Sequence, residues 1–362
     1  MIYLNVGFNW DLDLAKKLIK LNETYSKNTN VIIDSVYGST IDNPFGSARP
    51  VKRLSNVQTW WVRFKNCCLL LKNHGIKVNY TINSYCIGEE GKIKFEPAID
   101  WLFSLSTYVQ KVTIANPIIL YHILDDIPEK TFEIILSTIL NIDTQSHYLY
   151  YNNLSPDIKG ICLALSRNRD ISFLQKVSKF KIYTELLANE FCNINGCSCQ
   201  GIYRQCCYQN HSHNVFGGYN RFLMDICSTS RWNNPSSWLK ARFILPQWME
   251  LYEKIGINYL KITGRTHDSN YIYETTKSYM TRTFDKNLPL LWGLLENIYN
   301  KLPVRIPFTI DFNFEEKLKF INHWFDNPDF RCSEQLCGYS TGCMYCDIYY
   351  NHYFKINKGE PK

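Results

Sequence analysis

The fourteen cysteines of this 362-residue chain are concentrated in two short windows. Five lie between Cys192 and Cys207, one follows at Cys227, and four stand near the end of the chain, between Cys332 and Cys346. A disulfide framework is typical of small secreted domains that cannot build a core, and this chain is far too long to need one. Because the thiolate is a soft metal ligand, both windows predict metal or iron-sulfur binding.

The first window begins with the run from Cys192 to Cys199, in which Gly196 permits a tight turn. Further ligands are available from Cys197, Cys206, Cys207, Cys227, His211 and His213. Zinc would need a closed tetrahedron of thiolates and imidazoles, whereas a 4Fe-4S cluster needs four thiolates with looser spacing. The paired CxxC motifs of many zinc sites are absent here, and the residues alone leave zinc and iron-sulfur open.

The second window has the spacing C-x4-C-x5-C-x2-C and contains one CxxC half. Its members are Cys332, Cys337, Cys343 and Cys346. Four thiols within fifteen residues, among polar neighbours, predict a second metal site, either zinc or a cluster. Such a site would deliver electrons or act as a structural knot for the end of the chain.

Eight short, mostly apolar runs alternate with amphipathic helical segments along the first 284 residues. The runs cover 2–8, 31–39, 76–84, 111–116, 133–139, 158–165, 181–187 and 258–263. Eight such units predict a parallel sheet covered by helices and closed into a (β/α)8 TIM-like barrel, with a doubly wound open sheet as the alternative. We therefore predict a barrel domain at 1–284, with a Cys-rich insert at 192–245 after the seventh strand, and a Cys-rich extension at 285–362.

Three basic residues are candidate substrate-binding groups near the carboxyl ends of these strands, where barrel chemistry is located. Arg49 lies in the long segment 40–57 and Arg265 follows the last strand, so that each guanidinium can hold a carboxylate or phosphate. The alternative for each is a salt bridge that fastens a loop. Lys261 lies within the last strand, and it needs a charged partner if it faces the barrel.

The order of these motifs resembles peptidase family U32. The resemblance is carried by Cys192 and Cys199 after a barrel strand, the later cysteines, the run Lys261-Ile-Thr-Gly-Arg265 with Tyr271 beyond it, and the Leu165-Ser-Arg167 turn. It implies a 4Fe-4S cluster on Cys192, Cys199, Cys207 and Cys227, with Cys206 as the rival of Cys207 and Cys197 as the rival of Cys199. Family members of the iron-sulfur type act in oxygen-independent hydroxylation of RNA bases or quinone precursors.

The chain departs from the family pattern at two positions. Ala188-Asn189 replaces a His-Gly pair before the first cysteine, and Thr263 replaces the glutamate of the late strand. Both changes remove ionisable groups. We therefore expect a redox enzyme of the hydroxylase type, or one component of such a system, with a metal-dependent peptidase and a non-catalytic metal-stabilised partner protein as alternatives. A redox partner or a paralogous subunit of the same family is an implied partner.

Composition limits the remaining classes. The formal charge of +7, from 40 basic and 33 acidic residues, is compatible with RNA binding but is more typical of a surface that keeps the protein soluble. No secretory leader and no apolar run long enough to span a bilayer is visible, which predicts a cytoplasmic protein with reduced thiols and no membrane span. Motifs for a phosphate-binding loop, a dinucleotide fold and a zincin protease are also missing from the sequence.

Overall fold

The computed structural model describes residues 1–40, 42–45, 57–85, 95–192, 235–286, 288–292, 308–310, 313–332, 342–353 and 356–358. Within these ranges, eight parallel strands close into a barrel in sequence order, because the first strand pairs with both the second and the eighth. The strands are β1 (Ile2–Gly7), β2 (Val31–Gly38), β3 (Lys77–Ile82), β4 (Lys111–Ile114), β5 (Glu133–Leu136), β6 (Ile158–Cys162), β7 (Tyr183–Leu187) and β8 (Tyr259–Ile262).

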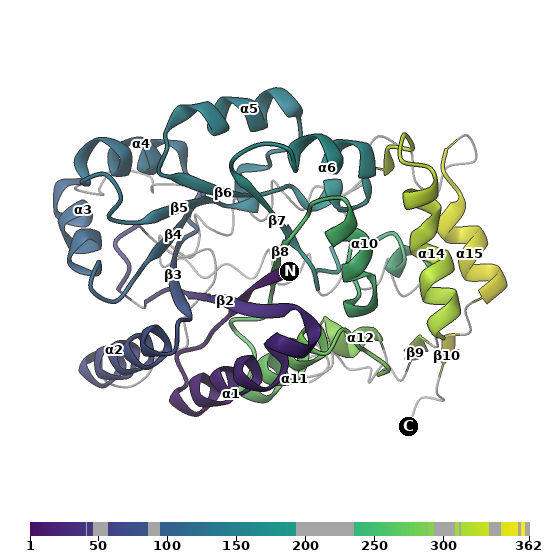
Figure 1. Cartoon of the computed structure of the whole chain (residues 1–362), viewed down its shortest axis with the longest axis horizontal. Coiled ribbons are helices and arrows are strands. Elements are labelled where there is room, and N and C mark those ends of the chain that lie inside the picture. Colours follow the sequence, from purple (N-terminus) through teal and green to yellow (C-terminus); the bar gives the residue numbers. More distant parts are fainter. Residues whose placement is uncertain are drawn as a thin grey trace.

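Helices follow the strands and form an outer ring around them (Figure 1). They are α1 (Leu12–Thr29), α2 (Val57–Asn73), α3 (Phe95–Ser104), α4 (Pro117–Asp126), α5 (Gln145–Leu154), α6 (Ile171–Val177), α10 (Met249–Lys254) and α11 (Ser269–Met280), with the 3-10 helices η1 (Thr138–Leu140), η2 (Leu165–Arg169), η4 (Pro235–Trp238) and η5 (Pro246–Trp248). The predicted (β/α)8 barrel is confirmed.

Local sequence explains where these helices begin. Asp11 accepts hydrogen bonds from the backbone N–H groups of Asp13 and Leu14, which starts α1, and Asn116 caps α4 in the same way. Pro117 occupies the first position of α4, where a missing N–H costs nothing. Asn116 therefore serves as a helix cap.

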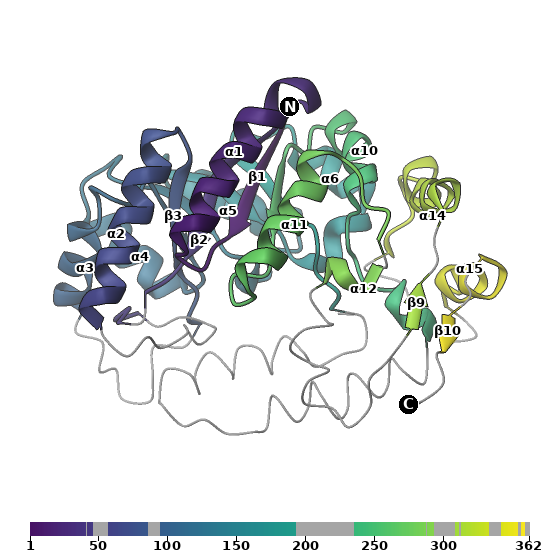
Figure 2. The same ribbon diagram turned by 90° about the horizontal axis from the view of Figure 1, so that it is seen from below.

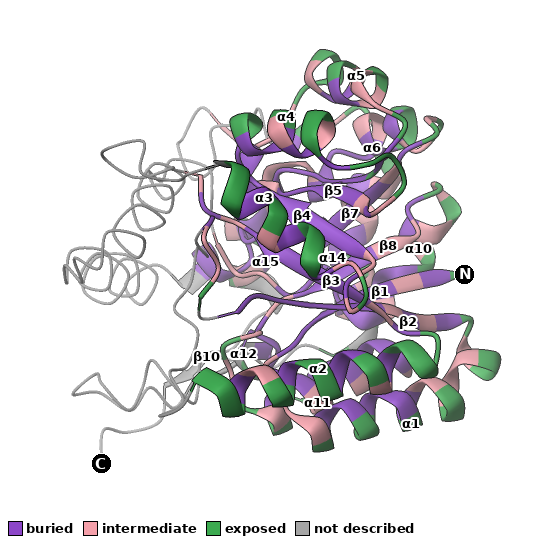
Figure 3. Ribbon diagram, turned by 90° about the vertical axis from the view of Figure 1, so that its left-hand side faces the viewer, coloured by how far each residue is buried: buried purple, intermediate pink, exposed green. Residues whose placement is uncertain are grey.

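One hydrophobic cluster joins the strands to the inner faces of the helices. Figure 3 shows burial on the strands and on the helix sides that face them, while the outward helix faces are exposed. Within α1, Leu14 and Leu18 belong to this cluster and Lys16 is exposed, as expected for an amphipathic helix on a sheet. The cluster is the core that holds the barrel interior in place.

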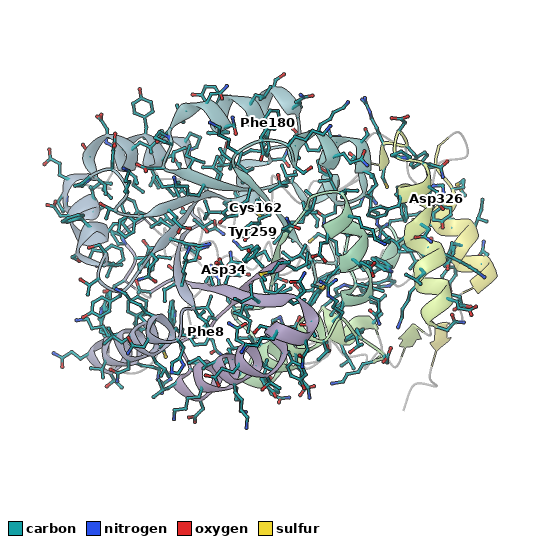
Figure 4. The ribbon with its side chains drawn as sticks, in the orientation of Figure 1. Phe8, Asp34, Cys162, Phe180, Tyr259 and Asp326 are labelled. Carbon is teal, nitrogen blue, oxygen red and sulfur yellow. The ribbon has the colours of Figure 1, made fainter. Side chains whose placement is uncertain are left out.

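The amino ends of the strands carry a layer of rings and charges. Tyr259 stacks on Tyr3 with 4.7 Å between ring centroids and on Tyr183 with 3.8 Å. Nearby, the buried Lys111 ammonium lies 2.6 Å from a carboxylate oxygen of Asp34. Figure 4 places Asp34 and Tyr259 within the ring of strands. This layer closes the end of the barrel opposite the one where barrel enzymes place their chemistry.

The described part of the extension packs on one side of the barrel (Figures 1 and 2). It comprises α12 (Leu288–Leu291), β9 (Phe308–Ile310), α14 (Phe314–Asp326), α15 (Tyr345–Tyr353) and β10 (Ile356–Lys358), and β9 and β10 form an antiparallel pair. Phe320 and Trp324 of α14 belong to the main hydrophobic cluster, so the extension shares the barrel's core. The boundary at residue 284 stays a prediction.

No helix in the described ranges combines the length and the hydropathy needed to cross a bilayer.

Candidate active site in the barrel

A buried polar centre lies inside the barrel, on strands that meet only through its interior. Glu185 on β7 accepts a hydrogen bond from the Asn5 side chain on β1 at 2.9 Å, although β8 separates these two strands in the sheet. The Ser35 hydroxyl on β2 donates to the side-chain oxygen Oδ1 of Asn5 at 3.2 Å. The contact between Asn5 and Glu185 therefore crosses the barrel lumen, which identifies both side chains as inward-facing.

Lys261 is the cation of this centre. Its ammonium lies 3.6 Å from the second carboxylate oxygen of Glu185 and 4.3 Å from the centroid of the Tyr37 ring. The Tyr37 hydroxyl in turn donates to the Ile262 carbonyl oxygen at 3.2 Å. Lys261 thus faces the barrel and has the charged partner that its burial requires, as the sequence predicted conditionally.

Cys162, the last residue of β6, completes the centre on the other side of Glu185. Burial, followed by the negative charge of Glu185, raises the pKa of the Cys162 thiol well above its usual value. A hydrogen bond to Glu185 acts in the same direction, because it holds the thiol in its protonated donor form. Cys162 is therefore a neutral thiol at physiological pH, and Figure 4 shows it within the ring of strands.

A neutral polar pair lies on β3 and β4. Thr113 donates to the Asn79 side-chain oxygen at 2.8 Å, and both residues are fully buried. Asn83, just beyond the end of β3, is half-buried. Asn79 therefore has an internal hydrogen-bond partner.

Cys192 lies at the mouth of the barrel, beyond the carboxyl end of β7. Its half-buried thiol packs against an apolar cluster formed by Cys162, Leu165 and Leu187. Because Cys162 contacts Glu185, this apolar cluster lies between the sequence-predicted metal ligand and the buried polar centre.

Arg265 lies just beyond β8, at the same end of the barrel. Its backbone approaches Gly7 so closely that a β-carbon at Gly7 would stand 2.8 Å from the Arg265 nitrogen. The Arg265 side chain is half-buried. Arg49, its predicted partner in substrate binding, lies outside the described residues, so their convergence stays a prediction.

A network of neutral groups occupies the neighbouring positions where the chain departs from the family pattern. The Asn189 side chain accepts a hydrogen bond from the Thr263 backbone at 2.6 Å and donates to the Tyr271 hydroxyl at 3.1 Å. Tyr271 donates to the Leu291 carbonyl oxygen at 2.8 Å, which ties α12 to the mouth. Asn189 and Thr263 therefore act on one another, so the two departures from the family pattern are structurally linked.

Most of the predicted cysteine ligands lie outside the described residues. This holds for Cys197, Cys199, Cys206, Cys207, Cys227 and Cys337. Cys332 and Cys346 are buried and Cys343 is half-buried. In the described ranges, no group of three or more His, Cys, Asp or Glu side chains is arranged to hold a metal ion. The two metal sites stay predictions.

Glu185 is a candidate functional residue that we did not predict from the sequence. The signal in the sequence was a carboxylate in the middle of a short strand that is otherwise uncharged. Because successive side chains of a strand point to opposite faces, Glu185 had to point either into the barrel or toward the helices. An unpaired carboxylate there would be costly, so a cation on another strand is required. Lys261 is that cation.

Known proteins similar to this chain include a curated relative and a solved structure, although no protein-family model matches it. The chain is similar to the uncharacterized protease MJ1657 of Methanocaldococcus jannaschii, with 23% identity over 229 residues, which covers 60% of this chain and 64% of that protein. The chain thus spans less than two thirds of that relative's length. Among solved structures it is similar to the U32 peptidase Mk0906, with a TM-score of 0.46 and 12% identity, over 72% of this chain and 92% of that one.

Proposed function

From its position as a divergent relative of peptidase family U32, we propose that this chain is an iron-sulfur redox enzyme of the oxygen-independent hydroxylase type, or one component of such a system. The observation that supports it is the packing of Cys192 against the apolar cluster that contains Cys162, whose thiol contacts Glu185 in the buried centre of the barrel. A metal ligand at the carboxyl end of the strands stands where barrel enzymes place their chemistry.

The surroundings of Cys192 fit a metal-bound thiolate. Its thiol is half-buried and packs against an apolar cluster that includes Leu165 and Leu187, which shields it in part from water. Cys199, Cys207 and Cys227 are the proposed further ligands of a 4Fe-4S cluster. When bound, such a cluster would accept single electrons from the substrate and pass them on.

The residues of the buried centre would transfer protons to and from the substrate and would hold the Glu185 carboxylate in place. Glu185 and Lys261 form a close pair in which a carboxylate can accept a proton and an ammonium can donate one. Asn5 fixes one carboxylate oxygen and leaves the other toward Lys261. Arg265, and Arg49 if its loop converges, would hold an anionic group of the substrate at the mouth.

The substrate class is either an RNA base or a small molecule such as a quinone precursor. The net charge of +7 would favour binding to the phosphates of RNA. Because such binding releases counterions from the RNA, its affinity would fall steeply as salt is added. A small molecule would bind with weak salt dependence. In either case hydroxylation with water as the oxygen source removes two electrons and two protons from the substrate, so the enzyme needs an electron acceptor, which we propose to be a redox partner or a paralogous subunit in the cytoplasm.

A hydrolase is the second candidate, and the Glu185–Lys261 pair favours it. The pair provides an acid and a base without any metal, and the relative MJ1657 is named a protease. This candidate predicts that peptide hydrolysis persists when all iron has been removed.

Anaerobic purification separates these candidates. Iron, acid-labile sulfide and zinc are counted per chain in the wild type, in Cys192→Ala and in the matched control Cys68→Ala, which removes a buried thiol from α2. The redox proposal expects about four iron and four sulfide for this cluster, lost in Cys192→Ala and retained in Cys68→Ala. Zinc without sulfide, or iron that is indifferent to Cys192, would overturn it.

A further inference from the structure

A second charged site lies away from the buried centre, where the extension meets the barrel. Arg169, the last residue of η2, is completely buried. Its guanidinium donates to the Leu239 carbonyl oxygen at 2.8 Å and to that of Ala241 at 2.5 Å. Three aromatic rings enclose it, with centroids 4.5 Å away in Trp324, 5.0 Å in Phe320 and 5.3 Å in Phe243.

The described surroundings of Arg169 leave its positive charge without a full counter-charge. Carbonyl oxygens and ring faces supply partial negative charge, but no carboxylate in the described residues contacts this guanidinium. Burial lowers the pKa of Arg169, and the guanidinium of Arg242, which is also buried, carries the same charge and therefore lowers that pKa further. A buried ion is costly unless an opposite charge accompanies it. An anion close to Arg169 would therefore stabilise the folded protein.

The thiols of the extension are the groups placed to supply that anion. The Cys346 thiol donates to the Leu239 carbonyl oxygen at 3.6 Å, the same oxygen that Arg169 uses. The Cys332 carbonyl oxygen accepts from Arg242 at 3.0 Å. Both side chains are at least nine-tenths buried, and a negative charge on either thiol would raise the pKa of Arg169. The Cys346 thiol and the Arg169 guanidinium, which are distant in sequence, thus share one carbonyl oxygen where the extension meets the barrel.

We propose that Cys332, Cys343 and Cys346 bind a soft metal ion as thiolates, and that Arg169 balances the negative charge of this centre. Cys343 and Cys346 have the CxxC spacing, and Cys346 lies in the first turn of α15. Three thiolates on a divalent ion carry one net negative charge, and a fourth adds another. Each thiol releases its proton to solvent when it binds the metal.

The alternative role for these thiols is that of small buried hydrophobic groups. That role explains their burial, but it gives no reason for the spacing of the array or for a neighbouring buried cation. The described thiols are not preassembled into a three-ligand group, so metal binding would draw them together and fasten α15 to the barrel. This centre is independent of Cys192 and of the proposed reaction.

The test counts metal in the full chain. Zinc, iron and sulfide are measured in the wild type, in Cys346→Ala and in Cys343→Ser, with Cys192→Ala and Cys68→Ala as controls. The proposal expects that both tail variants lose metal that both controls retain. Zinc without sulfide identifies a single ion, and iron with sulfide identifies a cluster. Because Cys343 is half-buried, its variant remains informative if Cys346→Ala does not fold. Folded Cys346→Ala and Cys343→Ser variants that hold as much metal as the wild type would overturn the proposal.

The charge-balancing role of Arg169 has its own test. Arg169→Gln removes the charge and Arg169→Lys keeps it, and affinity for the metal is measured by competition with a chelator. We expect Arg169→Gln to weaken binding about 10- to 100-fold, as for other groups that support metal ligands, and Arg169→Lys to weaken it less. The control is Arg282→Gln, which removes a cation paired with Glu253 elsewhere on the barrel. Equal affinity in Arg169→Gln and Arg282→Gln would assign Arg169 a packing role only.

Discussion

The Lys261 ammonium lies 3.6 Å from the Glu185 carboxylate inside the barrel, and the two side chains are 6% and 1% exposed. Two strands that neighbour each other in the sheet supply this pair, while Asn5 reaches the same carboxylate from β1, beyond β8. Closure of the barrel is what brings the three groups together. The arrangement is therefore a property of the complete fold and of no local segment.

Replacing Glu185 with Gln should destabilise the protein strongly. The substitution keeps the shape and an acceptor for Asn5 but leaves the Lys261 ammonium buried without its counter-charge. Breaking a buried pair in this way typically costs about 3–5 kcal/mol. The measurement is the midpoint of urea unfolding. As control, Glu274→Gln breaks a solvent-exposed pair with Lys286 and should shift the midpoint very little.

The double variant Glu185→Gln/Lys261→Met tests whether the unpaired charge causes that loss. Removing the ammonium as well eliminates the buried charge, so the double variant should be more stable than Glu185→Gln alone. The single variant Lys261→Met completes the comparison. If the losses in free energy of unfolding of the two single variants add up to that of the double variant, Glu185 and Lys261 do not interact as the geometry indicates.

Thiol alkylation should distinguish Cys67 from Cys192. Burial in α2 is the main cause that raises the pKa of the Cys67 thiol to about 12, so little thiolate exists near neutral pH. Cys192 is half-buried at the barrel mouth. In metal-free protein we expect iodoacetamide to modify Cys192 well before Cys67, as read by mass spectrometry of the peptides. Equal rates would mean that α2 opens readily in the native state.

Stability should fall at alkaline pH, in part through Tyr148. Burial is the main cause that raises the pKa of this phenol to about 12, against 10.0 for the unfolded chain. The neutral phenol is thus favoured in the folded state, so its contribution is complete below pH 10 and is lost as the pH rises toward 12. Melting temperatures measured across this interval should decline. Tyr148→Phe should make the decline shallower, and an unchanged slope would remove Tyr148 as a cause.

The strands of the barrel were predictable from the sequence, whereas its polar centre was not. Apolar runs bounded by turns identified all eight strands, because parallel strands covered by helices are buried on both faces. The helix α10 was missed within the long connection before β8, since six residues give little periodic signal. Glu185 was missed because the partner of an inward-facing side chain depends on how the barrel closes. The cysteine ligands outside the described ranges remain predictions.

Gly160 should be intolerant of even one added carbon. A β-carbon at this position on β6 would stand 2.3 Å from two ring atoms of Tyr183, far inside van der Waals contact. The Tyr183 ring has little room to move, because it stacks on Tyr259 with 3.8 Å between centroids and Tyr259 stacks on Tyr3. Overpacking of this kind usually costs about 1–3 kcal/mol.

We therefore expect Gly160→Ala to lower the melting temperature of the wild type. Adding Gly160→Ala to Tyr183→Leu should lower the melting temperature by less than Gly160→Ala lowers it in the wild type. The second comparison is necessary because Tyr183→Leu also removes the stacking on Tyr259. If alanine at position 160 costs as much in the Tyr183→Leu background as in the wild type, the ring stack does not oppose the added carbon. In that case the requirement for glycine would lie in the backbone of β6 itself.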